Sequence, residues 1–129
     1  MGTRYLLDTN VVIDFLAQRF SEKSELFVAE IIDENIYLSV INKIELLGFS
    51  KCENEMSLFI ESAKVFYLNE IIAQKTIEIR KNYKIKLPDA IIAATAISEN
   101  LVLLSNNESD FKNIKELKFL NPHKHYGRD

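Results

Sequence analysis

Residue types that cross-link, break or loosen a chain are scarce in this sequence. Its single cysteine, Cys52, rules out a disulfide within the chain, and we predict an inert thiol because no base stands beside it. Three glycines and two prolines among 129 residues argue against a disordered or linker-rich protein. No apolar run approaches the ~20 residues of a membrane-spanning helix, and the first residues lack an apolar secretion signal. We therefore expect a cytoplasmic protein that makes no membrane contact.

An excess of basic residues is also missing. Sixteen Lys and Arg residues stand against 19 Asp and Glu residues, which gives a net charge of −3. Nucleic-acid-binding domains are usually basic, so this charge argues weakly against such a role. The argument weakens if several acids share a metal site, because bound cations cancel much of the charge there. Basic residues gather at 80–86, where a solvated helix face and a nucleic-acid contact both stay open.

Two kinds of apolar pattern alternate along the chain. Short apolar runs predict strands, and apolar residues at helical spacing predict the helices between them. The strands are expected at 5–7, 36–40, 64–68, 101–104 and, as an edge strand, 117–120. Strands that alternate with helices predict an α/β fold. We expect one domain over residues 1–129, with a mostly parallel four- to five-stranded sheet covered by helices on both faces.

Acidic and amide residues follow the predicted strands. Asp8 ends the first strand, Glu45 lies in the early turns of the helix after the second, and Asp89 stands at a helix start. Asn107 and Asp110 follow the fourth strand. Ligands of parallel sheets bind beyond the carboxyl ends of the strands, so we expect these side chains to converge. Like charges in one pocket repel unless a cation is bound, and oxygen ligands without Cys or His indicate Mg²⁺ or Mn²⁺.

Each acid also has a plainer explanation when it is taken alone. Asp8 and Asp89 could be ordinary acids at helix starts, and Glu45 could be a solvated helix residue. The gathering of three or four acids at one edge favours the metal site. A phosphatase with Asp8 as nucleophile is a further hypothesis, but Asn10 stands where such enzymes usually carry a second Asp.

Three polar residues outside this group receive no metal assignment. His123 and His125 lie near the end of the chain, without Cys or acidic residues at metal-ligand spacing. Asp14, one helical turn beyond Asn10, could face the rim of the predicted pocket, but it is interpreted as a surface residue.

Four segments together resemble the PIN-domain nucleases, and within them the VapC-type toxins of bacterial toxin–antitoxin pairs. The segments are LLDTNVVI at 6–13, SVINKIEL at 39–46, LPDAIIAATA at 87–96 and LLSNNESDF at 103–111. The resemblance implies a Mg²⁺- or Mn²⁺-dependent endoribonuclease that cleaves cellular RNA and inhibits translation. It also implies a homodimer and a cognate antitoxin protein as partners. A non-catalytic PIN-like module that binds RNA or docks to a protein is the alternative.

The same resemblance implies roles for individual residues. The implied catalytic carboxylates are Asp8, Glu45, Asp89 and Asp110, and the implied metal ligands are these four with Asn107. Ser105, Thr9 and Asn10 would support them through hydrogen bonds. Many family members carry Asp where this chain has Asn107, so it stays open whether Asn107 or Asp110 fills the fourth acidic position, and whether one or two metal ions bind.

Overall fold

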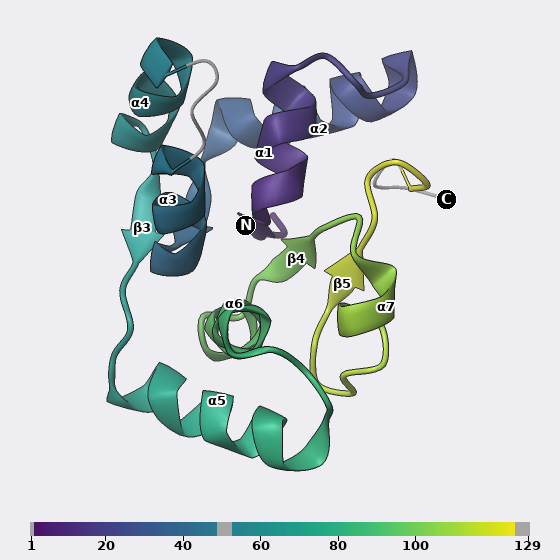
Figure 1. Cartoon of the computed structure of the whole chain (residues 1–129). Helices are drawn as coiled ribbons and strands as arrows, with labels where there is room; N and C mark the ends of the chain where they lie inside the picture. Colours follow the sequence, from purple (N-terminus) through teal and green to yellow (C-terminus); the bar gives the residue numbers. More distant parts are fainter. Residues whose placement is uncertain (1, 49–52, 126–129) are drawn as a thin grey trace.

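The apolar runs form the strands of a single sheet in the computed structural model, which describes residues 2–48 and 53–125. The prediction for Cys52 lies outside these residues. Within them the strands are β1 (Tyr5–Leu7), β2 (Tyr37–Ser39), β3 (Lys64–Phe66), β4 (Val102–Leu104) and β5 (Phe119–Leu120). Their order is β3-β2-β1-β4-β5, and every neighbouring pair is parallel (Figure 1). The predicted α/β fold with a parallel sheet is confirmed, and β5 is the predicted edge strand.

The second strand is shorter than predicted because a helix cap interrupts it. Ser39 Oγ accepts a hydrogen bond from the Ile41 amide at 3.0 Å, and Asn42 Oδ1 accepts one from the Ser39 amide at 2.9 Å. These reciprocal bonds form a capping box, which satisfies backbone N–H groups at the start of a helix. Val40 therefore belongs to the following helix, although its β-branched side chain favours a strand.

Helices connect the strands as the periodicity predicts. They are α1 (Thr9–Leu16), α2 (Glu22–Glu34), α3 (Val40–Leu47), α4 (Glu53–Glu61), α5 (Glu70–Asn82), α6 (Leu87–Ser98) and α7 (Glu108–Phe111). The short helix α7 was not predicted, because four residues carry no periodic signal. No helix in residues 2–48 and 53–125 has the length and apolar character needed to cross a bilayer.

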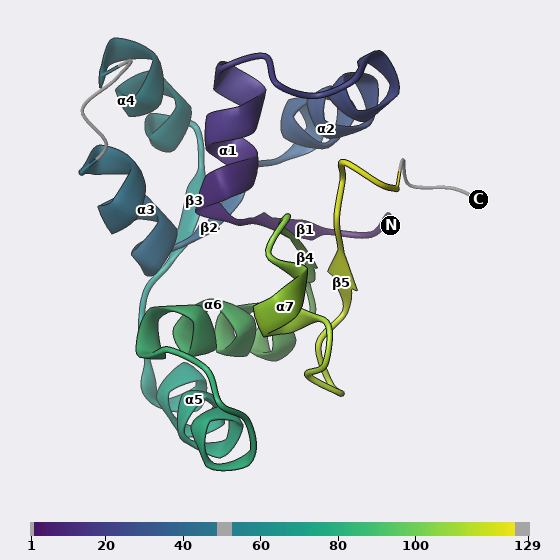
Figure 2. The same ribbon diagram turned by 45° about the vertical axis from the view of Figure 1, so that its right-hand side comes forward.

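The helices cover both faces of the sheet and bury two apolar clusters. Leu6 and Leu103 belong to the cluster with α5 and α6, whereas Leu7 and Leu104 belong to the cluster with α1, α2 and α4. Figures 1 and 2 show α5 and α6 on one side of the strands and α1 to α4 on the other. Alternate residues of a strand point to opposite faces, so each central strand contributes to both clusters. Burial of each such leucine stabilises the fold by roughly 1.5–3 kcal/mol.

The middle of helix α6 is completely buried. Residues 90–96 are all buried, because α6 lies between the sheet and α5. The Ala-rich sequence allows this close approach on several sides. The amino ends of α1, α3 and α6 meet at the carboxyl edge of the sheet, where α3 contacts both other helices.

Candidate active site

Asp8 occupies the junction between β1 and α1 and is 5% exposed. Its Oδ1 accepts hydrogen bonds from the Thr9 amide at 2.9 Å and from Asn42 Nδ2 at 3.2 Å. Its Oδ2 accepts bonds from Ser105 Oγ at 2.7 Å and from Asn10 Nδ2 at 3.2 Å. Burial raises the pKa of Asp8, and the bond from Ser105 opposes that rise without cancelling it. Asp8 therefore caps α1 and is also held rigidly by residues from three parts of the chain.

Asn42 is a supporting residue that the sequence analysis did not single out. It is fully buried, and its Oδ1 is committed to the Ser39 amide in the capping box. Its Nδ2 then faces Asp8 and also donates to Thr9 Oγ1 at 3.1 Å. The pattern Ser39-x-x-Asn42 is the sequence signal for the cap, but nothing in the sequence connects that cap to Asp8.

Glu45 lies one helical turn further along α3 and is exposed. Thr9 Oγ1 donates a hydrogen bond to Glu45 Oε1. Because the Thr9 backbone amide also binds Asp8, Thr9 connects the two carboxylates directly. The charge of Glu45 contributes to the raised pKa of Asp8, which places the two groups within electrostatic reach of each other.

Asp89, in the first turn of α6, interacts with the other predicted acids. Burial raises its pKa to about 6, and the negative charges of Asp110, Asp8 and Glu45 add to the rise. A hydrogen bond between the Asp89 and Asp110 side chains acts in the same direction. Asp89 thus shares one electrostatic environment with three acids that come from α1, α3 and α7.

Asn107 holds Asp110 in place through both ends of its amide group. Its Oδ1 accepts a hydrogen bond from the Asp110 amide at 3.3 Å, which caps α7, and its Nδ2 donates to Asp110 Oδ2 at 2.9 Å. Ser109 Oγ also donates to Asn107 Oδ1 at 3.2 Å. The amide oxygen is therefore already engaged within the loop, and the group that Asn107 presents to Asp110 is a donor.

Comparison with known proteins identifies the architecture that carries these acids. The family model for the PIN domain matches residues 5–117, which includes all five predicted site residues. This chain belongs to the PIN domain family. The resemblance predicted from the four sequence segments is thereby confirmed.

Several solved structures are similar to this PIN domain, among them a toxin–antitoxin complex. A toxin–antitoxin complex from Klebsiella pneumoniae contains a chain that is 27% identical, with a TM-score of 0.73 and coverage of 92% of this chain and 97% of that one. VapBC-1 from nontypeable Haemophilus influenzae is 26% identical, with a TM-score of 0.75 and coverage of 93% and 98%. FitAcB from Neisseria gonorrhoeae is 26% identical, with a TM-score of 0.71 and coverage of 92% and 97%. A sequence comparison with curated proteins gives no match.

The acids of this PIN domain suit a hard cation in their chemistry, but they do not close around one point. They offer only oxygen donors, and their mutual repulsion is the kind that a divalent ion relieves. Across residues 2–48 and 53–125, however, no three His, Cys, Asp or Glu side chains are arranged to hold a single metal ion. The predicted ligand roles of Asp8, Glu45, Asp89, Asn107 and Asp110 therefore stay predictions.

The interpretation of Asp14 as a surface residue is wrong. Asp14 is 8% exposed, and its Oδ2 lies 2.8 Å from His123 Nε2. Arg19 Nη1 lies 3.3 Å from its other oxygen. His123 belongs to the segment after β5, so this segment contacts the carboxylate on α1. The sequence carries no sign of this pairing, because the two residues are 109 positions apart.

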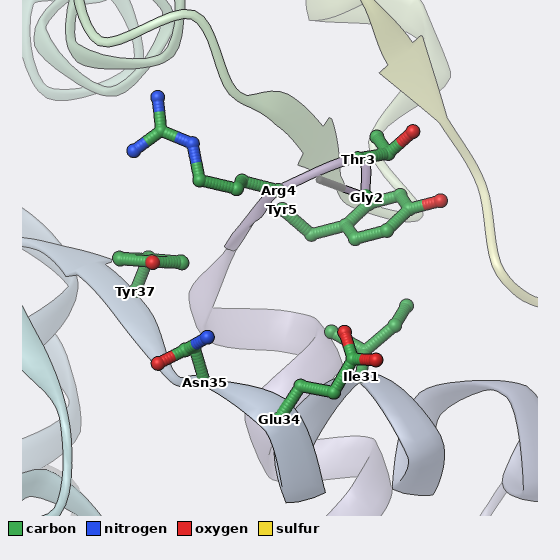
Figure 3. Close-up of a pocket in the computed structure, with 8 residues that line it drawn as sticks. All are labelled: Gly2, Thr3, Arg4, Tyr5, Ile31, Glu34, Asn35 and Tyr37. Atoms are coloured by element: carbon green, nitrogen blue, oxygen red, sulfur yellow. The ribbon is translucent and has the colours of Figure 1, made fainter.

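A well-formed pocket of this PIN domain lies at the opposite end of the strands. It has a volume of about 340 Å³ and is lined by residues at the start of β1, the end of α2 and the start of β2. Figure 3 shows these side chains, including Arg4, Tyr5, Glu34 and Tyr37. None of the five predicted site residues lines this pocket. The acids instead occupy the carboxyl edge, where ligands of parallel sheets bind.

Proposed function

We propose that this protein is a metal-dependent endoribonuclease, the toxin of a toxin–antitoxin pair, which cleaves cellular RNA and thereby inhibits translation. One observation carries the proposal: Asp8, Glu45, Asp89 and Asp110 interact electrostatically at the carboxyl edge of a PIN domain. We propose that these four carboxylates are the catalytic groups of a single nuclease domain formed by residues 1–129. The similarity to toxin–antitoxin structures supports the biological role.

The four carboxylates would hold Mg²⁺ or Mn²⁺, with Asp110 as the fourth ligand in preference to Asn107. When bound, such an ion supplies Lewis-acid activation of water and stabilises charge on a phosphate. The oxygen of Asn107 is engaged in the cap of α7, which supports a positioning role for this residue instead. A bound cation would relieve the repulsion that raises the pKa of Asp89.

Three of the four carboxylates have a neighbour that fixes their orientation. Ser105 and Asn10 hold one oxygen of Asp8, Thr9 holds Glu45, and Asn107 holds Asp110. Supporting hydrogen bonds of this kind orient metal ligands and increase their basicity. Asp89, with its pKa of about 6, exchanges a proton near neutral pH and ionises fully when a positive charge is nearby.

The proposal is tested by incubating the protein with total RNA, with and without Mn²⁺, and comparing it with Asp8→Asn. Asparagine still caps α1, so the variant should fold. We expect Mn²⁺-dependent cleavage that falls by more than the 10- to 100-fold typical of the loss of a supporting hydrogen bond. Retention of cleavage by purified Asp8→Asn protein would rule out this active site.

A non-catalytic RNA-binding or protein-docking module is the second candidate. The observation that favours it is the lack, in the described part of the chain, of three acids arranged to hold one metal ion. RNA binding that needs no divalent cation, without cleavage of any RNA, would support this candidate over the nuclease.

We also propose a homodimer and a cognate antitoxin as protein partners. Large apolar side chains are exposed on α3, α4 and α5, including Ile44, Leu47, Leu58 and Ile71, the last 70% exposed. Leu47 also lines a hollow of about 480 Å³ between α3, α4 and β3. Exposed apolar groups of this size mark protein interfaces. Light scattering of the protein alone and of a co-expressed complex measures both assemblies.

A further inference from the structure

The turn after β5, residues 121–124, is connected to the loop that follows β4 through two separate sets of contacts. In this turn the His123 amide donates to Asn121 Oδ1 at 3.0 Å, and the Lys124 amide donates to the Asn121 carbonyl oxygen at 3.0 Å. These bonds give the turn a defined shape of its own. Its side chains can therefore act as fixed anchors for the neighbouring residues 105–110, which carry Ser105 and Asp110.

One anchor is Glu108, at the first position of α7. Asn121 Nδ2 donates to Glu108 Oε2 at 3.1 Å, and Lys124 Nζ donates to Glu108 Oε1 at 3.1 Å. The bond from Asn121, followed by that from Lys124, lowers the pKa of Glu108. The far side of the loop is thus fastened to the turn at pH values where Glu108 is ionised.

The other anchor is Asp14 on α1. His123 Nε2 lies 2.8 Å from Asp14 Oδ2, and the His123 ring packs against the Phe20 ring with centroids 4.4 Å apart. Arg19 lies on the other side of the carboxylate, at 3.3 Å. Asp14 is almost completely covered, so its bond with His123 is better shielded from water than an ordinary surface ion pair.

Asn106 connects this anchor to the proposed active site. Its Nδ2 donates to Asp14 Oδ2 at 3.4 Å, and its backbone amide donates to Asn10 Oδ1 at 3.1 Å. Asn10 Nδ2 in turn donates to Asp8 Oδ2 at 3.2 Å. The Asn10 amide cannot reverse without losing both bonds, because its oxygen accepts a backbone N–H. Side-chain and backbone contacts therefore connect His123 to Asp8 without a break, by way of Asp14, Asn106 and Asn10.

We propose that His123 and Asp14 are positioning residues, which fix the orientation of Asp8 through Asn106 and Asn10. Neither residue touches the four carboxylates of the proposed site. Their role is to hold the loop after β4 against α1, so that Asn10 and Ser105 both face Asp8 Oδ2. The effect on turnover rests on the proposed nuclease function, whereas the effect on Asn10 does not.

The test compares His123→Ala with His123→Gln and with His125→Ala. Glutamine keeps a side-chain nitrogen that can reach Asp14, while His125 is an exposed histidine of the same segment and serves as the matched control. Nuclear magnetic resonance of the Asn10 side-chain amide and the Asn106 backbone amide reports the connection directly. We expect both signals to shift in His123→Ala, to return towards wild type in His123→Gln and to stay in place in His125→Ala.

Turnover provides the second readout. We expect kcat of RNA cleavage to fall roughly 10-fold in His123→Ala, as for loss of an outer hydrogen-bonding partner, with KM unchanged and with substantial recovery in His123→Gln. Asp14→Asn, which keeps the shape of the side chain, should reproduce the shifted Asn10 signal if His123→Ala does not fold.

Two results would overturn the proposal. The first is an Asn10 signal at its wild-type position in both His123→Ala and Asp14→Asn. The second is an equal loss of turnover in the alanine and glutamine variants. A wild-type protein that cleaves no RNA would instead contradict the proposed function, and the Asn10 signal would still decide the positioning role.

Discussion

The two ends of the same strands differ in how their polar groups are used. At the carboxyl edge, Asp8 accepts four hydrogen bonds from donors on α1, α3 and the loop after β4. At the amino edge, Arg4 donates to the Glu99 carbonyl oxygen at 2.6 Å and lies 5.8 Å from the centre of the Tyr37 ring. The pocket in Figure 3 lies at this amino edge.

This difference shows that the pocket of a protein and its cluster of interacting acids can lie at opposite ends of the same sheet. A parallel sheet brings the amino ends of α1, α3 and α6 to one edge, and those ends stabilise negative charge. The helix ends offset part of the repulsion among the acids that gather there. The amino edge receives helix C-termini, and its pocket gathers rings and a single arginine without acids that act on one another.

Among variants that compare the two edges, we expect the largest loss of RNA cleavage when a residue that orients an acid at the carboxyl edge is removed. Replacement of Asn107 by alanine takes away both the cap of α7 and the donor that orients Asp110. We expect RNA cleavage to fall roughly 10- to 100-fold, and the free energy of unfolding to fall by about 1 kcal/mol. Steady-state cleavage and urea unfolding measure the two effects.

Asn113→Ala is the matched control for this variant, because Asn113 is an exposed asparagine just beyond α7. It should leave both quantities unchanged. Full activity in Asn107→Ala would show that Asp110 needs no fixed orientation, and it would remove the contrast between the two edges.

We expect a change in pH, or the addition of metal, to have an intermediate effect on the stability of the fold. The pKa of Asp89 in the fold, about 6, lies above its ordinary value of 3.8. Between these values the folded protein binds more protons than the unfolded chain, so the free energy of unfolding falls as pH rises from about 4 to 7. After allowance for partial exposure, we expect this fall to amount to about 1–2 kcal/mol.

Asp89→Asn removes that titration and should be more stable than wild type at pH 7, but not at pH 4. Mn²⁺ at pH 7 should raise the unfolding temperature of the wild type and have little effect on the variant. Asp33→Asn, which changes an exposed acid on α2, provides the control. Unfolding profiles of wild type and Asp89→Asn that run parallel from pH 4 to 7 would contradict the coupling among the acids.

The smallest effect is expected at the amino edge. Arg4→Ala loses one hydrogen bond and one cation–ring contact, both exposed to solvent. We expect a loss of roughly 0.5–1 kcal/mol in the free energy of unfolding and no change in RNA cleavage. A large loss of cleavage in this variant would mean that the pocket in Figure 3 belongs to the functional site.

Most of the fold could be predicted because its signals are local. Short apolar runs along the chain predicted the position of all five strands described here. The end of β2 was misplaced because Ser39 and Asn42 cap a helix at that point. Side-chain hydrogen bonds of this kind override the strand preference of a β-branched residue such as Val40.

The site was accessible to sequence reasoning only in part. The placement of Asp8, Glu45 and Asp89 follows from the topology of a parallel sheet, which needs only the order of the elements. The residues that hold these acids in place cannot be predicted from the topology. Asn42 and Asn106 bind Asp8 and Asp14 through contacts between distant parts of the chain, and no spacing along the sequence reports such contacts.

The hydrogen bond between Ser105 and Asp8 spans 97 residues, and β1 lies between β2 and β4 in the sheet. During synthesis, the first strand must therefore wait for β4 before its second neighbour arrives. A ribosome that carries an unfinished chain holds Asp8 without Ser105, and without the loop that bears Asp110. The proposed site is therefore assembled only after Asp110 has been synthesised, because the carboxylate nearest the amino terminus and its partner Ser105 are made so far apart in time.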